Sequence, residues 1–376
     1  MSAVHFMPWC PLDKEYEVGE ISLIPFDRAA TNDQYDSTEL SQVLSILSSY
    51  RDFEGRPNPE LTLVKYQGRP MFSELPSEEY EIARELVELA CFSAISRRTY
   101  FSFGDYCNAT NFILYGQRFT VGSNHVVIVS RRGDGATNSM RAIGNTVFSM
   151  PSQAKPLGKV NLDEQLLDSV VAFREGADSK EWSRWQNSIA CFNLANTDAD
   201  NITHQVEWTL LCSAFERLLA ADSKAIDVAM RFSAVFAPTN PIPISDATRK
   251  PSRCSDKTKP LSLEWMREFY SVRGDFAHGK LNTGQPLAWH PLEHLSLARI
   301  AFPLLLKCLL SIAGKYTVTE HDLAEIDAFE CLANAAFLTE PPDSQGSMDS
   351  WWQRCQSQAK RQITIKAAVK YWNEHR

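Results

Sequence analysis

Two side chains near the end of one predicted helix could act together on a phosphodiester. Arg273 carries a permanent charge in a planar fork that matches phosphate oxygens. His278 can give and take a proton near neutral pH. The two residues are five positions apart in the sequence. On an ideal helix this spacing leaves their side chains about 140° apart. They therefore converge only if the last turn is distorted or if a second copy of the chain completes the site. Capping of the helix end by the same two residues is the structural alternative.

The segment 261–280 predicts the helix that positions both residues. Apolar residues recur in it at helical spacing from Leu263 to Phe276. Ser262 suits an N-cap, Gly279 suits a left-handed C-cap, and Pro260 discourages an earlier start. We expect Arg273 and His278 to lie in the last turns of this helix.

The run YSVRGDFAHG at 270–279 resembles the signature of HEPN domains, in which an Arg is followed a few residues later by a His. The Tyr before the Arg and the Gly after the His are most similar to the ApeA-like branch. Two upstream segments resemble helices of that branch in the same order: 206–219, with Glu216 before Arg-Leu-Leu, and 225–236, with Arg231. The family usually has Asn, Asp, Ser or His directly after the Arg. Here that residue is Gly274, and Asp275 follows it.

The resemblance covers roughly the second half of the chain and implies a metal-independent endoribonuclease without a cofactor, such as a bacterial toxin or antiviral effector. His278 would act as general acid or base, Arg273 would stabilise phosphoryl charge, and Asp275 would orient His278 or contact the ribose. One chain offers one His and one Arg, so separate acid and base groups favour a homodimer through the motif helices. The alternative, which Gly274 favours, is a non-catalytic binding or dimerisation module for RNA, a nucleotide or a protein.

A Pro-rich segment at 238–260 leads directly into the motif helix and is the most basic part of the chain. It is long for a connection between helices, and such loops are often functional or mobile. It predicts a guide for the RNA backbone, and a solvated loop is the alternative. The candidate RNA-binding residues are Arg249, Lys250, Arg253, Lys257 and Lys259, together with Lys280 after the helix.

No group of residues predicts a metal site. His290 and His294 have a spacing that metal sites use, but no third ligand stands out, so capping and surface roles are expected. The nine cysteines form no C-x-x-C pair, which favours buried thiols in a reducing compartment. Residues 1–9 do not read as a secretory signal, and the apolar run near 300–312 is too short to span a bilayer. We therefore expect a cytoplasmic protein without a membrane partner.

The 376 residues are enough for two domains of ordinary size. Strand-like segments and a helix at 77–97 predict an α+β domain over 1–150, a sensor or scaffold through which a phage-derived or cellular trigger could act. A polar, Pro-containing stretch at 151–160 predicts a linker. An all-α, HEPN-like bundle is expected over 161–339, followed by a flexible stretch and a basic, aromatic helix over 340–376. The formal net charge of −8 restricts any RNA contact to a local basic surface.

Overall fold

The computed structural model describes residues 2–28, 37–98, 106–120, 125–131, 137–143, 146–154, 158–249, 251, 256–277 and 287–335. Side chains are described for these residues except at 37, 125–131, 137–143 and 275–277. The chain forms two compact units. Unit 1 comprises Met1–Thr99, Phe103–Val171 and Asn196–Ala199, and unit 2 comprises Tyr100–Ser102, Ala172–Ala195 and Asp200–Arg376.

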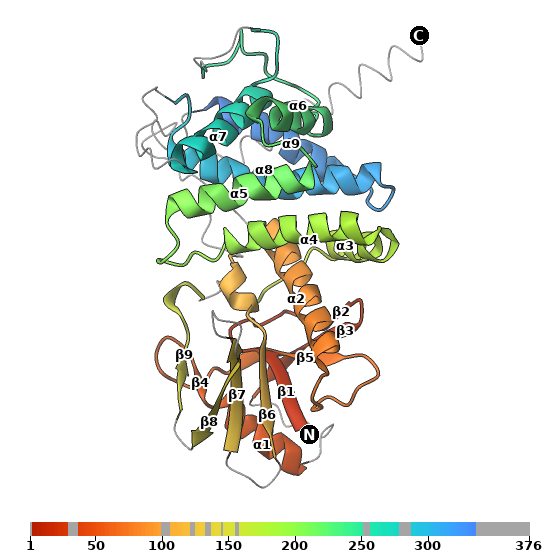
Figure 1. Cartoon of the computed structure of the whole chain (residues 1–376), viewed down its shortest axis with the longest axis vertical. Helices are drawn as coiled ribbons and strands as arrows, with labels where there is room; N and C mark the ends of the chain where they lie inside the picture. Colours follow the sequence, from red (N-terminus) through yellow and green to blue (C-terminus); the bar gives the residue numbers. More distant parts are fainter. Residues whose placement is uncertain are drawn as a thin grey trace. The chain divides into compact units, whose positions relative to one another are not determined.

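Unit 1 contains an antiparallel sheet in the order β2-β3-β5-β1-β6-β7-β8 (Figure 1). The tight turn between β2 and β3 begins at Gly19, whose φ of +54° favours glycine. β7 and β8 pair antiparallel from His125↔Ile143 to Arg131↔Thr137. The strands of the sheet are β1 Ser2–Met7, β2 Tyr16–Val18, β3 Ile21–Asp27, β5 Glu60–Tyr66, β6 Tyr115–Phe119, β7 His125–Arg131 and β8 Thr137–Ile143.

Helices and a short second sheet complete the described part of unit 1. The predicted helix at 77–97 is confirmed as α2, and most of its second half is buried. A core of large side chains lies between the sheet and α1, with Phe6 and Tyr50 fully buried. Burying such a side chain contributes about 1.5–3 kcal/mol. The remaining elements are α1 Ser37–Leu47, β4 Tyr50–Arg51, α2 Ser77–Arg97, the 3₁₀ turns η1 Ala109–Phe112 and η2 Ser152–Ala154, and β9 Phe148–Ser149, which pairs with β4 in parallel.

The segment expected to be a linker, 151–160, is an integral part of unit 1 at its described residues. The carbonyl of Ala154 accepts a hydrogen bond of 2.5 Å from the Asn111 amide. Val160 N donates to Pro11 O at 2.8 Å, and Val160 O accepts from Asp13 N at 3.1 Å. The division between the units falls instead inside α3 (Glu164–Gly176), after Val171. The polar, Pro-containing composition of 151–160 is that of a loop. Hydrogen bonds to Asn111, Pro11 and Asp13 hold this loop in unit 1.

The described part of unit 2 is helical, so the predicted order of an α+β part followed by a helical part is confirmed. Its core is aromatic: Trp208 and Phe269 stack with ring centroids 5.1 Å apart, and Trp265 stacks on Phe269 at 5.5 Å. The helices are α4 Ser179–Leu194, α5 His204–Leu218, α6 Ala225–Val235, α7 Leu261–Ala277, α8 Pro291–Ile312 and α9 Glu320–Asn334 (Figure 1).

By length and composition, helix α8 is long and apolar enough to cross a membrane. The sequence-based expectation considered only the run near 300–312, which is shorter than the whole helix. About two thirds of its most apolar window, 67%, is buried within the protein. Its inward face includes Leu297, Phe302 and Leu305, none of which is exposed. The core helix of a globular unit has the same composition, so α8 is weak evidence for a membrane span.

Candidate functional site

Helix α7 holds Arg273 because the middle of the helix is fixed in the core. Trp265, Met266 and Phe269 are fully buried on its inner face. The indole of Trp208, on α5, donates a hydrogen bond of 2.8 Å to the carbonyl of Phe269. Arg273 lies one turn further along, where α7 leaves the core, and its side chain is 29% exposed. The position of α7 relative to α5 is therefore set directly before the motif arginine.

Arg273, Glu216 and Tyr270 form a compact polar cluster between α7 and the end of α5. Arg273 Nη1 lies 2.5 Å from Glu216 Oε2 and donates to the Tyr270 hydroxyl, also at 2.5 Å. The same hydroxyl donates to Glu216 Oε2 at 2.5 Å. Ser223 supplies a further hydroxyl to Glu216 Oε1 at 2.7 Å. These contacts fix one guanidinium nitrogen, Nη1, and leave the side chain partly open to solvent.

The charges of this cluster are stable near neutral pH. Burial raises the pKa of the Glu216 carboxyl, but the Tyr270 and Ser223 hydroxyls and the Arg273 charge outweigh it, so the pKa lies below its ordinary value. The pKa of Tyr270 is raised, first by burial and then by its bond to Glu216. Burial lowers the pKa of Arg273, yet the neighbouring groups raise it above its ordinary value. Glu216 is thus ionised, Tyr270 protonated and Arg273 charged.

The cluster joins two of the segments that resemble HEPN helices. Glu216 belongs to the segment 206–219, most of which lies in α5. Tyr270 and Arg273 belong to the motif on α7. Sequence reasoning singled out Glu216 only as part of a pattern and missed its contact with Arg273. The signal available was an acidic residue in one signature segment and an unpartnered basic residue in the other. Their pairing requires the tertiary structure.

The other predicted catalytic residues lie at or beyond the limit of the described structure. The backbone of Asp275 is in α7, but its side chain is outside the described part. His278 and Lys280 lie outside the described residues. Gly274 is exposed, and a Cβ there would meet no atom within 4 Å. Packing around the described residues therefore does not require a glycine at the position where the family has a polar residue.

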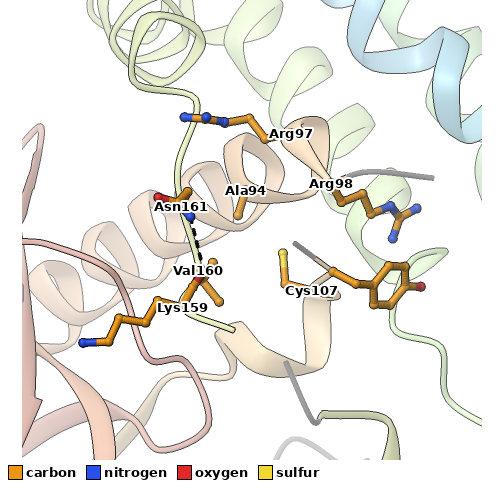
Figure 2. A pocket seen from close by; sticks show the side chains of 8 residues that line it. Ala94, Arg97, Arg98, Cys107, Lys159, Val160 and Asn161 are labelled. Carbon is orange, nitrogen blue, oxygen red and sulfur yellow. Dashed lines mark hydrogen bonds between the residues drawn. The ribbon is translucent and has the colours of Figure 1, made fainter. Parts of the chain in front are cut away.

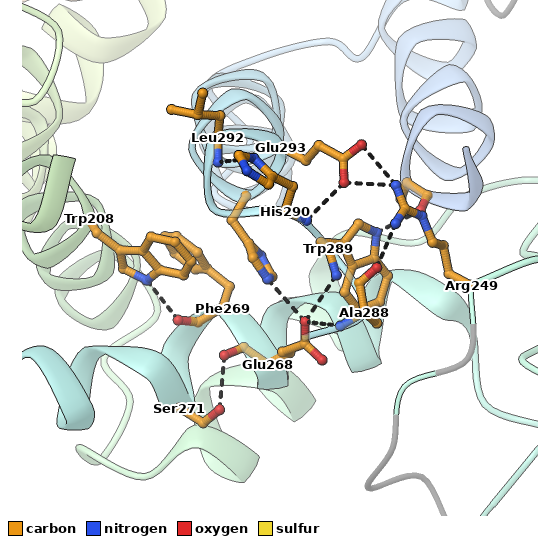
Figure 3. A network of polar contacts seen from close by, with 12 residues as sticks. Trp208, Arg249, Glu268, Phe269, Ser271, Ala288, Trp289, His290, Leu292 and Glu293 are labelled. Atoms are coloured by element: carbon orange, nitrogen blue, oxygen red, sulfur yellow. Dashed lines mark hydrogen bonds and ion pairs between the residues drawn. The ribbon is translucent and has the colours of Figure 1, made fainter. Parts of the chain in front are cut away.

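Arg249 is a correction to the predicted RNA-binding set, because it braces the bundle from inside (Figure 3). Its Nη2 forms bonds of 2.8 and 2.7 Å to both oxygens of Glu293, whose side chain is fully buried. Nη1 donates to Ala288 O at 2.6 Å, and Nε and Nη2 donate to Ala335 O at 3.2 and 2.8 Å. Only 15% of the Arg249 side chain is exposed. Its donors serve the fold and are not directed at a ligand.

The remaining basic candidates are divided between described and undescribed positions. Lys257 is exposed, and Lys259 is partly exposed. Their carbonyls accept hydrogen bonds from Ser245 N and Ile244 N at 3.0 and 3.1 Å, so the two ends of the segment 243–260 run side by side. Lys250 and Arg253 lie outside the described residues. Among the described contacts, none joins Lys257 or Lys259 to Arg273.

The first half of the 238–260 segment is held by hydrogen bonds to α9. Asp327 accepts from Thr239 N at 2.6 Å and from Asn240 N at 3.1 Å. Asn334 accepts from Thr248 N at 2.6 Å. These acceptors lie seven residues apart on one face of α9, which spans Glu320–Asn334. The segment is therefore anchored at both ends of its first half.

The two histidines at metal-like spacing have separate structural roles. His290 is the N-cap of α8: Leu292 N donates to its Nδ1 at 3.3 Å, which confirms the predicted capping role. The expected surface role of His294 is wrong. Its side chain is fully buried among aromatic rings, and its Nε2 lies 3.2 Å from Glu268 Oε1. Burial lowers the pKa of His294. In the described part of the chain, no group of three or more metal-ligating side chains is present.

No protein-family model, no curated protein and no solved structure matches this chain.

Proposed function

We propose that the chain is a metal-independent endoribonuclease of the HEPN type. The observation that carries the proposal is the cluster in which Glu216 and Tyr270 hold the motif arginine (2.5 Å contacts). Two segments that each resemble the family, 206–219 and 270–279, meet there. A partly exposed arginine with a fixed guanidinium is suited to a phosphodiester because its planar fork matches phosphate oxygens.

In this proposal Arg273 stabilises the charge that grows on the phosphoryl oxygens during the reaction. His278 removes the proton of an RNA 2′-hydroxyl or protonates the leaving 5′-oxygen. The 2′-oxygen attacks the neighbouring phosphorus as the bond to the 5′-oxygen breaks, which leaves a 2′,3′-cyclic phosphate and a 5′-hydroxyl. Asp275 orients His278 or contacts the ribose.

The proposal also includes the assembly and setting of the enzyme. Two copies that meet through their α7 helices provide two histidines and two arginines, enough for a separate acid and base. The substrate is RNA, the reaction needs no cofactor, and the protein acts in the cytoplasm as a toxin or antiviral effector. Unit 1 receives the phage-derived or cellular trigger.

A non-catalytic RNA-, nucleotide- or protein-binding module is the second candidate. It is favoured by the ion pair itself, since Glu216 neutralises part of the charge that Arg273 would offer to a phosphate. Gly274 also stands where the family has a polar residue. A binding module would retain RNA without cutting it.

The test is cleavage of single-stranded RNA by the purified full chain in the presence of EDTA. Arg273→Ala should lower the rate by about 10²-fold or more, as should His278→Ala. Arg184→Ala is the matched control, because Arg184 also pairs with a carboxylate, Glu181 at 3.5 Å, and is similarly exposed, at 31%. Equal rates for the wild type and Arg273→Ala would reject the proposal. RNA binding without cleavage would favour the binding module.

A further inference from the structure

The basic side chains that line a cavity in unit 1 do not converge on one point. The cavity, of about 60 Å³, lies at the C-terminal end of α2 (Figure 2). Arg97, Arg98 and Lys159 line it, and Figure 2 shows their charged ends directed away from one another. A different pair of arginines in unit 1 is placed to act together. Arg28 directly follows β3, and Arg51 ends β4.

Arg28 and Arg51 flank the same short segment, residues 57–59. Arg51 forms an antiparallel bridge with Pro57. Arg28 continues the antiparallel pairing of β3 with β5, and its backbone N donates to Pro59 O at 3.0 Å. The two arginines therefore stand on opposite sides of one extended segment, and two strand spacings separate their backbones by about 10 Å.

The alternation of side chains along this segment places both arginine side chains on one face. Pro57 and Pro59 are two residues apart, so they share a face, and residues that lie opposite each other on neighbouring strands share it too. Asn58, between the two prolines, points to the other face and is buried, whereas Pro59 is exposed. Arg28 and Arg51 consequently leave from the outer face, where their long side chains can meet one ligand above the prolines.

Within the part of the chain that the structure describes, no carboxylate pairs with Arg28 or Arg51. The Nε atom of each is shielded from solvent and has no hydrogen-bond partner there. Arg51 Nη1 donates to a neutral acceptor, Gly55 O, at 3.1 Å. Asp52, next to Arg51, pairs instead with Arg56 at 3.0 Å. Burial lowers the pKa of Arg28, and the charge of Arg51 lowers it further, so the two guanidinium groups are close enough to repel each other.

Two partly buried cations that repel each other destabilise a fold, and an anion between them removes that cost. A phosphate group carries a charge of about −1.5 to −2 near neutral pH, which balances two guanidinium groups, whereas a carboxylate balances one. Guanidinium N–H groups also form paired hydrogen bonds to phosphate oxygens.

We propose that Arg28 and Arg51 bind one phosphate group on the outer face of residues 57–59, either as the free ion or as the terminal group of a small phosphomonoester. The site makes unit 1 a ligand-binding part of the chain. This inference stands independently of the proposed ribonuclease activity, because it concerns other residues and requires no reaction.

The test is calorimetric titration of the full chain with inorganic phosphate and, separately, glycerol phosphate, at constant ionic strength. Arg28→Gln and Arg51→Gln should each raise the dissociation constant by about tenfold or more, the worth of one charge-assisted hydrogen bond. Arg56→Gln is the matched control and should leave it unchanged, since Arg56 is nearby but already pairs with Asp52 and Glu54 and is 66% exposed. Saturable binding of only one titrant identifies the ion or the ester as the ligand, and binding of both shows that the phosphate group alone is recognised.

A second readout does not depend on the variants. Phenylglyoxal modifies arginine side chains, and bound phosphate should slow the modification of Arg28 and Arg51 but not that of Arg56, as measured by mass spectrometry of their peptides. The proposal is overturned if neither titrant binds saturably, or if Arg28→Gln and Arg51→Gln bind as tightly as the wild type. It is also overturned if phosphate protects all three arginines equally or protects none of them.

Discussion

At the scale of single residues, Glu216 has two consequences for Arg273. The carboxylate orients the guanidinium through Nη1, and it also places a negative charge 2.5 Å from the group that would meet a phosphate. Orientation favours catalysis because the guanidinium does not have to reorganise during the reaction. The charge opposes phosphate binding. Replacing only the charge, while the shape and the acceptor are kept, separates these two effects.

Glu216→Gln should lower the rate of RNA cleavage by about tenfold or more, because the Arg273 guanidinium is held less precisely. The variant should also change stability with a defined pH dependence. The folded-state pKa of Glu216 is depressed, so its stabilisation is present above the unfolded-state value and is lost as pH falls through the folded-state value. Urea unfolding should show the wild type more stable at pH 7, with the difference shrinking as the pH falls below the unfolded-state pKa of a glutamate. A faster variant would show that the charge matters more than the orientation.

Arg249 gives a second prediction at this scale, one that distinguishes bracing from RNA binding. Arg249→Ala leaves the buried Glu293 carboxylate without its cation, so it should lower the free energy of unfolding by about 3–5 kcal/mol. Lys257→Ala, at an exposed neighbouring position, should change it by less than about 0.5 kcal/mol. Chemical denaturation of the two variants measures both values. A stable Arg249→Ala protein with weakened RNA binding would restore the original prediction.

The sequence could predict which residues could act in binding or catalysis. It could not predict which of them form ion pairs and hydrogen bonds that stabilise the fold. Arg249 and Lys257 look alike in a basic, Pro-rich segment. Arg249 is distinguished by partners far along the chain, such as Glu293, which lies 44 residues away. Likewise, the pairing of Arg273 with Glu216 spans 57 residues. Periodicity and capping patterns act over a few residues, so they cannot report such partners.

At the scale of elements, α9 organises the approach to the motif helix. Its polar face anchors the 238–249 segment through Asp327 and Asn334. Glu330, between them, accepts from Ser262 N at 3.3 Å and so caps the first turn of α7. Helix spans such as 77–97 could be predicted from capping and periodicity. The role of α9 could not, because Asp and Asn on a helix face are equally typical of a solvated surface.

Glu330→Gln should reveal the charge state at this junction. Burial raises the pKa of Glu330 to about 7, and Glu330 is fully buried. The stabilisation from a raised carboxyl pKa is present below the unfolded-state value and is lost as pH rises through the folded-state value. The variant cannot ionise, so it should be more stable than the wild type at pH 8, by at most about 3 kcal/mol. Denaturation across pH 4–8 should show the two proteins converge near pH 4.5, and a constant difference would contradict this account.

At the scale of the whole molecule, the order of an α+β part and a helical part could be predicted, but the boundary could not. A change in periodicity located the transition near 150–160. The division lies inside α3, and the turn at 196–199 returns to unit 1, where Asn196 O accepts from Ala109 N at 2.8 Å. A compact unit is defined by contacts between segments that are distant in the sequence. Composition indicates only where a loop lies, so it could not predict the boundary.

The proposed dimer should be detectable from the mass of the protein in solution and from the inhibition of wild-type chains by an inactive variant. Light scattering of the full chain at micromolar concentration should give twice the monomer mass. If the site needs both copies, a fivefold excess of His278→Ala protein should reduce activity per wild-type chain to about a sixth, the statistical fraction paired with another wild-type chain. An equal excess of a double variant, His278→Ala with Arg273→Ala, should act in the same way. Undiminished activity, or monomers alone with and without RNA, would show that each chain acts independently.

The most direct test of the central claim is the end group left on a defined oligonucleotide cut in the presence of EDTA. The substrate is a single-stranded RNA, compared with the DNA of the same sequence and with an RNA that carries one 2′-deoxynucleotide at the mapped cleavage position. We expect cleavage of the RNA only, with a 2′,3′-cyclic phosphate on the 5′ fragment, because the nucleophile is the neighbouring 2′-oxygen. The single deoxy substitution should abolish that cut and leave others intact. Cleavage at the deoxy position, cleavage of DNA, or a 5′-phosphate on the 3′ fragment would contradict the mechanism.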